Sequence, residues 1–541
     1  ALKPTKTGLA SDGQASASQA STRSIATSGA RPSRSSATRS SPWIAAASSQ
    51  DLHVSRRAQA ASLKLVVLTY WIVLHRSAEA VTWNWRLGQY NCPCMQSVYV
   101  GGIGMTKFGK DPRSLAEICH DAAQTALTSS EIQEVEAIYI GVMNPEEFTG
   151  DSNIASHIAD ALGLTGIPAV RIETASSAGA AAIQAGFQAV ASGYYRRVLV
   201  LGGEKMTHLS TSATTRVLAG VIDKEERQCG ATMPALAAMI TEKYREKFNL
   251  SQSRLETMLC AVAVKNHGNG TRNPMAQFQK PISRETYLAS KYVATPLRLY
   301  DCSPITDGAA AVVLTNEKTD VRLAGVGQGT GPLSLRGRDI FTSFPATRMA
   351  AARAYQMAET SPQGIDFAEV HDAFTPFEII TTEDLGFFAP GKGGDAVLEG
   401  VTAAEGRLPV NPSGGLKARG HPVGASGLAQ IVEVVKRLRG ETGSKQPFNR
   451  GLTQSTGGLA SNNFVTILER TDASLPHTKG FPQPSRQVAK SRPATMPMSK
   501  EGVIETFTIL YVTPDGFLPP LALALIREQN GGLILAQGEE S

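Results

Sequence analysis

The sequence predicts an α/β fold made of two similar halves. From Val98 onward, short runs of β-branched residues alternate with stretches of helical periodicity, which is typical of helices packed against buried parallel strands. The order of strand, small-residue turn and apolar helix at Ile172–Gly193 occurs again at Leu408–Arg439, which indicates a duplication. Two facing halves of this kind would bring their turns to one shared site.

Four strands and three helices are predicted before this pattern is interrupted. The strands are expected at Val98–Ile103, Ala137–Ile140, Ala169–Ile172 and Val198–Leu201. The helices are expected at Ser114–Thr128, Asn153–Leu162 and Ala178–Gly193. Residues 207–300 contain longer amphipathic helices, so they are predicted to form a loop domain inserted in a first half of residues 95–318. Alternation resumes at Gly308–Leu314, and residues 319–470 form the second half.

The two ends of the chain differ from this body in composition. Residues 1–94 are rich in Ser, Ala and Arg and poor in acids, so they are predicted to be a disordered or targeting-like extension that contributes nothing to the fold. Residues 471–501 have the composition of a linker. The tail, residues 502–541, is predicted to hold three strands, at Ile504–Val512, Leu521–Ile526 and Leu533–Gln537.

Charge and cysteine content exclude several classes of function. The net charge of +6 comes from residues 1–94, which carry +8, whereas the rest of the chain carries −2. The body therefore has no basic surface for nucleic acid, and no apolar run is long enough to be a stable membrane span. The six cysteines form no CxxC pair, so no metal site is expected.

We expect an intracellular protein, mitochondrial or peroxisomal if the extension is retained and otherwise cytoplasmic.

Two segments carry residues suited to chemistry. The run Asn411–Gly427 places five glycines and two prolines around His421, so the histidine is held by a tight backbone and its ordinary pKa suits proton transfer. The alternative is a glycine-rich turn with a core histidine. In Ile172–Gly179 a strand turns into a helix, and this would present Ser176 at a helix N-terminus that stabilises an oxyanion. The alternative is that Ser176 only caps the helix.

Asn411–Gly427 resembles the Gly-His-Pro motif of the thiolase superfamily, and Val370-His-Asp-Ala-Phe374 resembles the His-Asp-Cys-Phe element of its sterol-carrier-protein branch. The resemblance covers Val98–Arg470. It implies a duplicated five-layer αβαβα architecture, a homodimer, and acyl-CoA as a thioester substrate with no tightly bound cofactor. Ser176 stands where the family has its nucleophilic Cys. Ala373 and Ser455 stand where acid/base cysteines occur.

The resemblance also implies roles for the remaining site residues. His371 would hold a water that binds the thioester oxygen, and the backbone N–H of Gly457, beside Gly458, would complete a second oxyanion hole. His267 lies in a segment resembling the lid near pantetheine, where it either contacts ligand or caps a loop. Gly420 and Gly458 are expected to contact substrate. Cys302 is expected to be buried and inert.

The predicted function is acyl transfer from a CoA thioester in lipid, fatty-acid or sterol side-chain metabolism, with Ser176 in place of cysteine. Thiolysis is doubtful because returning an acyl group from an oxygen ester to a thiol runs uphill. One alternative is a retro-aldol lyase acting on 3-hydroxyacyl-CoA. Another is a non-catalytic acyl-CoA-binding or scaffold protein. The tail resembles the start of an OB fold, with three strands where a barrel needs five. It is expected either to pair with another chain, an OB-fold or thiolase-associated protein, or to be truncated.

Overall fold

The computed structural model describes residues 95–130, 134–444 and 446–472, together with the backbone of three strands at 502–510, 521–528 and 533–538. The predicted extension of residues 1–94 lies outside the described residues, as does the predicted linker apart from residues 471 and 472. No helix in the described part of the chain is both long enough and apolar enough to cross a bilayer.

The first half contains each of the predicted strands and helices, with small differences in length. Its strands and helices are β1 Tyr99–Met105, α2 Leu115–Ser129, β2 Ala137–Gly141, α3 Pro145–Thr149, α4 Ile154–Ala161, β3 Ala169–Ile172, α5 Ala178–Ala191, β4 Arg197–Glu204 and β7 Gly308–Thr315. Ser114 begins α2 with a capping box, in which its side chain accepts from the Glu117 N–H and the Glu117 carboxylate accepts from the Ser114 N–H.

The inserted segment is mostly helical. It consists of α6 Thr211–Leu218, η1 Ala219–Val221, α7 Lys224–Gln228, α8 Met233–Lys247, α9 Gln252–Gly270, α10 Arg284–Leu288, β5 Tyr292–Ala294, β6 Leu297–Arg298 and η2 Leu299–Asp301. The longer amphipathic helices expected in this segment are present, and α9 extends to Gly270, so His267 is helical.

The second half repeats the strand and helix types of the first. Its strands and helices are β8 Val321–Thr330, α11 Pro345–Met357, η3 Pro362–Gly364, β9 Phe367–Glu369, α12 Thr375–Asp384, α13 Gly393–Leu398, α14 Gly415–Arg419, η4 Val423–Ala425, α15 Ser426–Leu438, β10 Arg450–Gly457 and β11 Asn462–Arg470.

The strands of both halves form one mixed sheet in the order β3-β2-β4-β7-β1-β8-β11-β10-β9. The prediction of parallel strands was only partly right. β3, β2 and β4 are parallel to one another, as are β9 and β10, but β7, β1, β8 and β11 pair antiparallel to their neighbours. β1 and β8 join the two halves through a single pair, Tyr99 with Arg322.

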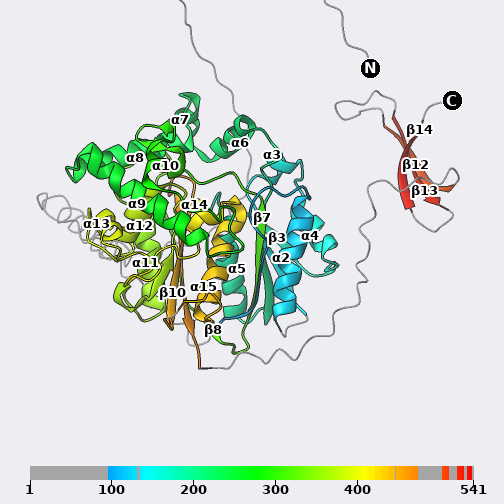
Figure 1. Ribbon diagram of the computed structural model, residues 1–541. Helices are drawn as coiled ribbons and strands as arrows, with labels where there is room; N and C mark the ends of the chain where they lie inside the picture. The colour runs from blue at the N-terminus through cyan, green and yellow to red at the C-terminus, as the bar shows by residue number, and fades with distance from the viewer. Residues whose placement is uncertain are drawn as a thin grey trace, which may run out of the picture. The chain divides into compact units, whose positions relative to one another are not determined.

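The predicted αβαβα layering is confirmed. Figure 1 shows α11 at one side, then the strands of the second half, then α15 with α5, then the first-half strands, and α2 at the far side. The two central helices approach closely, because a Cβ on Gly427 of α15 would lie 2.6 Å from the backbone nitrogen of Ala180 in α5. The N-termini of both central helices therefore meet at one end of the sheet.

The three tail strands are present at β12 Gly502–Leu510, β13 Leu521–Glu528 and β14 Leu533–Gly538. They form an antiparallel sheet in that order. Its assignment to an OB fold stays a prediction, since three strands do not close a barrel.

Candidate functional site

The turn between β3 and α5 holds Ser176. Ala175 has a φ of 56°, a left-handed conformation that is uncommon for residues other than glycine and that tightens the turn. The residue at the N-cap of α5 is Ser177, and no side chain caps the helix there. Ser176 is half-buried, and its hydroxyl makes no hydrogen bond with the described residues. The capping alternative for Ser176 is therefore wrong, and its hydroxyl is available to a ligand.

Gly457 lies directly against this turn. A Cβ at Gly457 would come within 2.2 Å of the Thr174 carbonyl oxygen and 2.5 Å of Ser177 Oγ, so only glycine fits. The structure thus brings the end of β10 onto the turn that carries Ser176. The neighbouring Gly458 has a φ of 58° and begins the turn into β11.

His371 and His421 lie together. Their rings meet edge to face with centroids 5.2 Å apart, and both side chains are buried. The backbone N–H of His371 donates to Gln454 Oε1 at 3.1 Å, and the backbone N–H of His421 donates to Thr306 Oγ1 at 2.9 Å. Each histidine is therefore held by a buried polar side chain from another part of the chain.

The hydrogen bonds around Ser426 determine the tautomer of His421. Ser426 Oγ donates to the Pro422 carbonyl oxygen at 2.9 Å, and His421 Nδ1 lies 2.7 Å from the same hydroxyl. Because the hydroxyl has only one hydrogen, it must accept from the Nδ1–H of His421. The Nε2 atom is then the unprotonated nitrogen and can act as a base.

Burial keeps both histidines neutral. Desolvation lowers the pKa of His421 to about 3, and the positive charge of Arg419 acts in the same direction. The pKa of His371 is held well below its ordinary value by burial, by His421 and by Arg419. The Arg419 guanidinium is itself fully buried and lies 3.5 Å from the Glu369 carboxylate.

The surroundings of Gly420 and His267 in the structure differ in part from those predicted from the sequence. Gly420 has a φ of 116°, and a Cβ there would lie 2.9 Å from Thr306 Cγ2, so conformation and packing account for this glycine. Both ring nitrogens of His267 are buried without a hydrogen-bond partner among the described residues, and its role as a ligand contact or a loop cap stays a prediction. Cys302 is half-buried rather than buried, and desolvation raises the pKa of its thiol to about 12.

Three polar side chains near the histidines were not assigned roles from the sequence. Ser426 and Lys417 lie within the Asn411–Gly427 run, but spacing alone does not show which side chain faces His421. Ser455, in β10, has a buried hydroxyl without a hydrogen-bond partner. Burial of an unpaired hydroxyl is unfavourable, so Ser455 is also available to a ligand.

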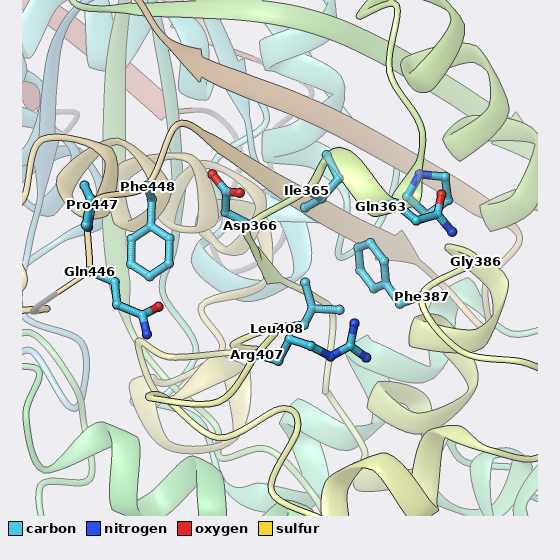
Figure 2. A pocket seen from close by; sticks show the side chains of 11 residues that line it. Gln363, Ile365, Asp366, Gly386, Phe387, Arg407, Leu408, Gln446, Pro447 and Phe448 are labelled. Carbon is cyan, nitrogen blue, oxygen red and sulfur yellow. The ribbon is translucent and has the colours of Figure 1, made fainter.

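A cavity of about 350 Å³ lies away from these residues. Figure 2 shows its lining, with Phe387 and Arg407 on one side and Phe448 on another. Ile365 and Asp366 line it just before β9, whereas His371 follows that strand, so the cavity lies at the opposite end of β9 from the histidine pair. A second, largely apolar groove of about 520 Å³ lies between α8 and β5.

Comparison with protein families gives two adjoining matches. Residues 98–318 match the family model described as "Thiolase, N-terminal domain". Residues 327–470 match the one described as "Thiolase C-terminal domain-like". Together these matches cover the mixed sheet, apart from the first residues of β8, and the segment inserted in it.

Individual relatives agree with the family matches. An acetyl-CoA acetyltransferase of Methanothermobacter thermautotrophicus is 41% identical over 389 residues, which cover 70% of this chain and 100% of the relative. Sterol carrier protein 2 of Oryctolagus cuniculus is 31% identical over 436 residues, which cover 75% of this chain and 76% of the relative. A solved structure, the Ltp2-ChsH2(DUF35) aldolase, has a TM-score of 0.61 at 23% identity, covering 70% of this chain and 100% of that one, and this likeness concerns the fold.

Replacing Ser426 with Ala should change the populations of the two His421 tautomers. Without the hydroxyl, Nδ1 loses its acceptor, so both tautomers become populated and the Nδ1–H form no longer dominates. Imidazole ¹⁵N chemical shifts in histidine-labelled protein would report this change. The matched control is Ser192→Ala, which removes an exposed hydroxyl that donates to the Ala189 carbonyl oxygen. An unchanged His421 spectrum in Ser426→Ala would contradict the assignment.

The same spectra should show no protonation of His371 or His421 between pH 8 and pH 5. Burial disfavours the imidazolium form and lowers both pKa values, so each ring stays neutral until the pH falls below this range. In the urea-unfolded chain the histidines should titrate near pH ~6.5. A folded-state midpoint between pH 6 and 7 for either ring would show that it is charged during part of the physiological range.

Proposed function

The chain belongs to the thiolase family and is an acyltransferase of that family, and we propose that it takes the acyl group of a coenzyme A thioester on the hydroxyl of Ser176. The observation that carries this proposal is the hydrogen bond between His421 Nδ1 and Ser426 Oγ, because it leaves Nε2 unprotonated. A base in this state is what an alcohol nucleophile requires, since an alcohol must lose its proton during attack.

Packing between the two halves supports His421 as that base. A Cβ on Gly179, in the first turn of α5, would lie 2.4 Å from the Gly424 carbonyl oxygen, three residues beyond His421. The Gly424 N–H donates to the buried Glu204 carboxylate at 3.0 Å, and the Met143 N–H donates to the same oxygen. These contacts hold the His421 loop against the helix that begins just after Ser176.

In the proposed step, Ser176 Oγ attacks the thioester carbonyl carbon while its proton passes to His421 Nε2. The carbon–sulfur bond then breaks, an oxygen ester forms, and the thiol of coenzyme A leaves with the proton from His421. The oxyanion that develops would be stabilised by a water held by His371 and by the backbone N–H of Gly457. Coenzyme A enters as part of the substrate, so the proposal needs no tightly bound cofactor.

The product of this step constrains the reaction that follows. An oxygen ester is less activated than a thioester, so its acyl group passes more readily to water, an alcohol or a carbanion than back to a thiol. We therefore propose acyl transfer in lipid, fatty-acid or sterol side-chain metabolism rather than thiolysis. The second candidate is retro-aldol cleavage of a 3-hydroxyacyl-CoA, which the unpartnered Ser455 hydroxyl and the histidines would serve without an acylated serine.

Intact-mass measurement of the protein mixed with acetyl-CoA should reveal an added acetyl group. Ser176→Ala should abolish the adduct because it removes the attacking oxygen. Ser177→Ala is the matched control, since Ser177 adjoins Ser176 but its hydroxyl is engaged with Thr174, and the adduct should persist. Ser176→Cys should form an adduct faster, because a thiol is the better nucleophile.

Two results would overturn the covalent proposal. An adduct that survives in Ser176→Ala would place the acyl group on another residue. A protein that forms no adduct with acetyl-, butyryl- or octanoyl-CoA, yet cleaves a 3-hydroxyacyl-CoA, would instead support the retro-aldol reaction.

We also propose that the protein is a homodimer joined through β3. This strand is an edge of the mixed sheet, and Val170 on it is 45% exposed, so a second copy could add its own β3 and bury both edges.

Light scattering should return twice the chain mass of 57.3 kDa. Val170→Lys should give the monomer mass, whereas Leu299→Lys, at an exposed position of the inserted segment, should not. A monomeric parent protein would contradict the proposal.

A further inference from the structure

Lys417 is a buried amine with no carboxylate partner. Its side chain, in α14, is only 2% exposed, and Nζ donates to the Cys302 carbonyl oxygen. Nζ also lies 5.8 Å from the ring centre of Tyr300, and it makes no ion pair within the described residues. An ammonium group that leaves water for one neutral acceptor is unfavourable unless an anion joins it.

The two carboxylates whose charges act on Lys417 already accept hydrogen bonds from other groups. Asp301 accepts hydrogen bonds from the hydroxyls of Tyr287 and Thr375 and from the Arg298 N–H. Asp372 accepts from the Asn266 side chain and from the N–H groups at the start of α14. Both therefore act on Lys417 only at longer range. Burial lowers the pKa of Lys417 to about 8, so the amine is still protonated in most molecules at pH 7.

His267 and Tyr300 add two further polar groups beside Lys417. The His267 ring meets the Tyr300 ring edge to face at 5.6 Å and stacks on Phe278 at 5.5 Å. Both His267 nitrogens are buried without a hydrogen bond. The backbone of Lys280 raises the pKa of the ring, an effect smaller than that of burial, which lowers it to about 4. The Tyr300 hydroxyl makes no hydrogen bond with the described residues.

This cluster adjoins the histidine pair. Cys302, whose carbonyl oxygen accepts from Lys417, forms a bridge with Phe374, and the Ser303 N–H donates to the Ala373 carbonyl oxygen at 2.9 Å. Two residues later, Ile305 forms a bridge with His421. The short segment 302–305 therefore runs from the Lys417 contact to the histidine pair, so both groups of side chains are placed along one stretch of backbone.

We propose that Lys417, His267 and Tyr300 form a subsite for a carboxylate on the acyl chain, so that the protein prefers acyl-CoA substrates with such a carboxylate over unsubstituted ones. The inference rests on the proposed function, because it assumes that the thioester binds beside His371 and His421. An ammonium, an imidazole N–H and a phenol O–H together match a carboxylate, which only accepts hydrogen bonds. The phosphates of coenzyme A are separated from the thioester by the whole pantetheine arm and would not reach this cluster.

Calorimetric titration with succinyl-CoA and butyryl-CoA tests the subsite. Both carry four-carbon acyl groups, and only the first has a free carboxylate. In a Ser176→Ala background, which prevents acyl transfer, we expect succinyl-CoA to bind about 10-fold or more tightly than butyryl-CoA, as a charge-assisted hydrogen bond would produce. Adding Lys417→Met should bring the ratio of the two Kd values to about 1. Lys436→Met, on α15 and outside the cluster, should keep the original ratio.

Methionine has a shape similar to that of lysine, so Lys417→Met should fold. If it does not, Tyr300→Phe removes one hydroxyl and should lower the ratio about 3-fold. Equal affinity for the two ligands in the parent protein, or a preference that survives both substitutions, would overturn the subsite. Free succinate that binds without any preference for succinyl-CoA would also overturn it, by revealing a separate carboxylate site. Failure to bind butyryl-CoA at all would instead count against the proposed function.

Discussion

The buried carboxylate of Asp372 is the contact on which the site depends. It follows His371 directly, and its oxygens accept from the N–H of Leu416 at 2.6 Å and from the Asn266 side chain at 2.7 Å. The end of β9, the start of α14 and the end of α9 are thereby held at one point. A Cβ on Gly415 would come within 2.3 Å of Asp372 Oδ2, so glycine is required there for the carboxylate to reach the helix.

A second buried carboxylate extends this arrangement. Glu378 pairs with Lys265 at 3.0 Å and accepts from the side chains of Asn266 and Asn411. Asn411 in turn accepts from the Val370 N–H at 2.8 Å, next to His371. The first part of the glycine-rich segment, at Asn411 and Leu416, is therefore tied to the residues on either side of His371, while His421 lies further along that segment. Removing either carboxylate would leave buried donors without acceptors, which is more costly than the loss of one hydrogen bond.

Much of the fold could be predicted from the sequence because its periodicity is local. The apolar spacing in Ala178–Ala191 and Ser426–Leu438 predicts the two central helices, and the glycines nearby predict their close approach. Strand direction could not be predicted, because an antiparallel pair such as β4 and β7 depends on contacts between residues about a hundred positions apart. At the site, the sequence pointed to His421 and Ser176. It could not show that Ser426 orients the imidazole or that Ser177, rather than Ser176, lies at the N-cap.

In the proposed mechanism the attacking atom is the oxygen of Ser176 rather than a cysteine sulfur, and this would change how the protein responds to oxidants. Sulfur nucleophiles are converted to sulfenic and sulfinic acids in proportion to their thiolate content, whereas alcohols are not. The nearest described cysteine, Cys302, donates to the Arg298 carbonyl oxygen and has a raised pKa, so little of it is thiolate. The proposed reaction would therefore not depend on the redox state of its surroundings, and the protein would not need the thiol-reducing systems that keep a cysteine nucleophile active.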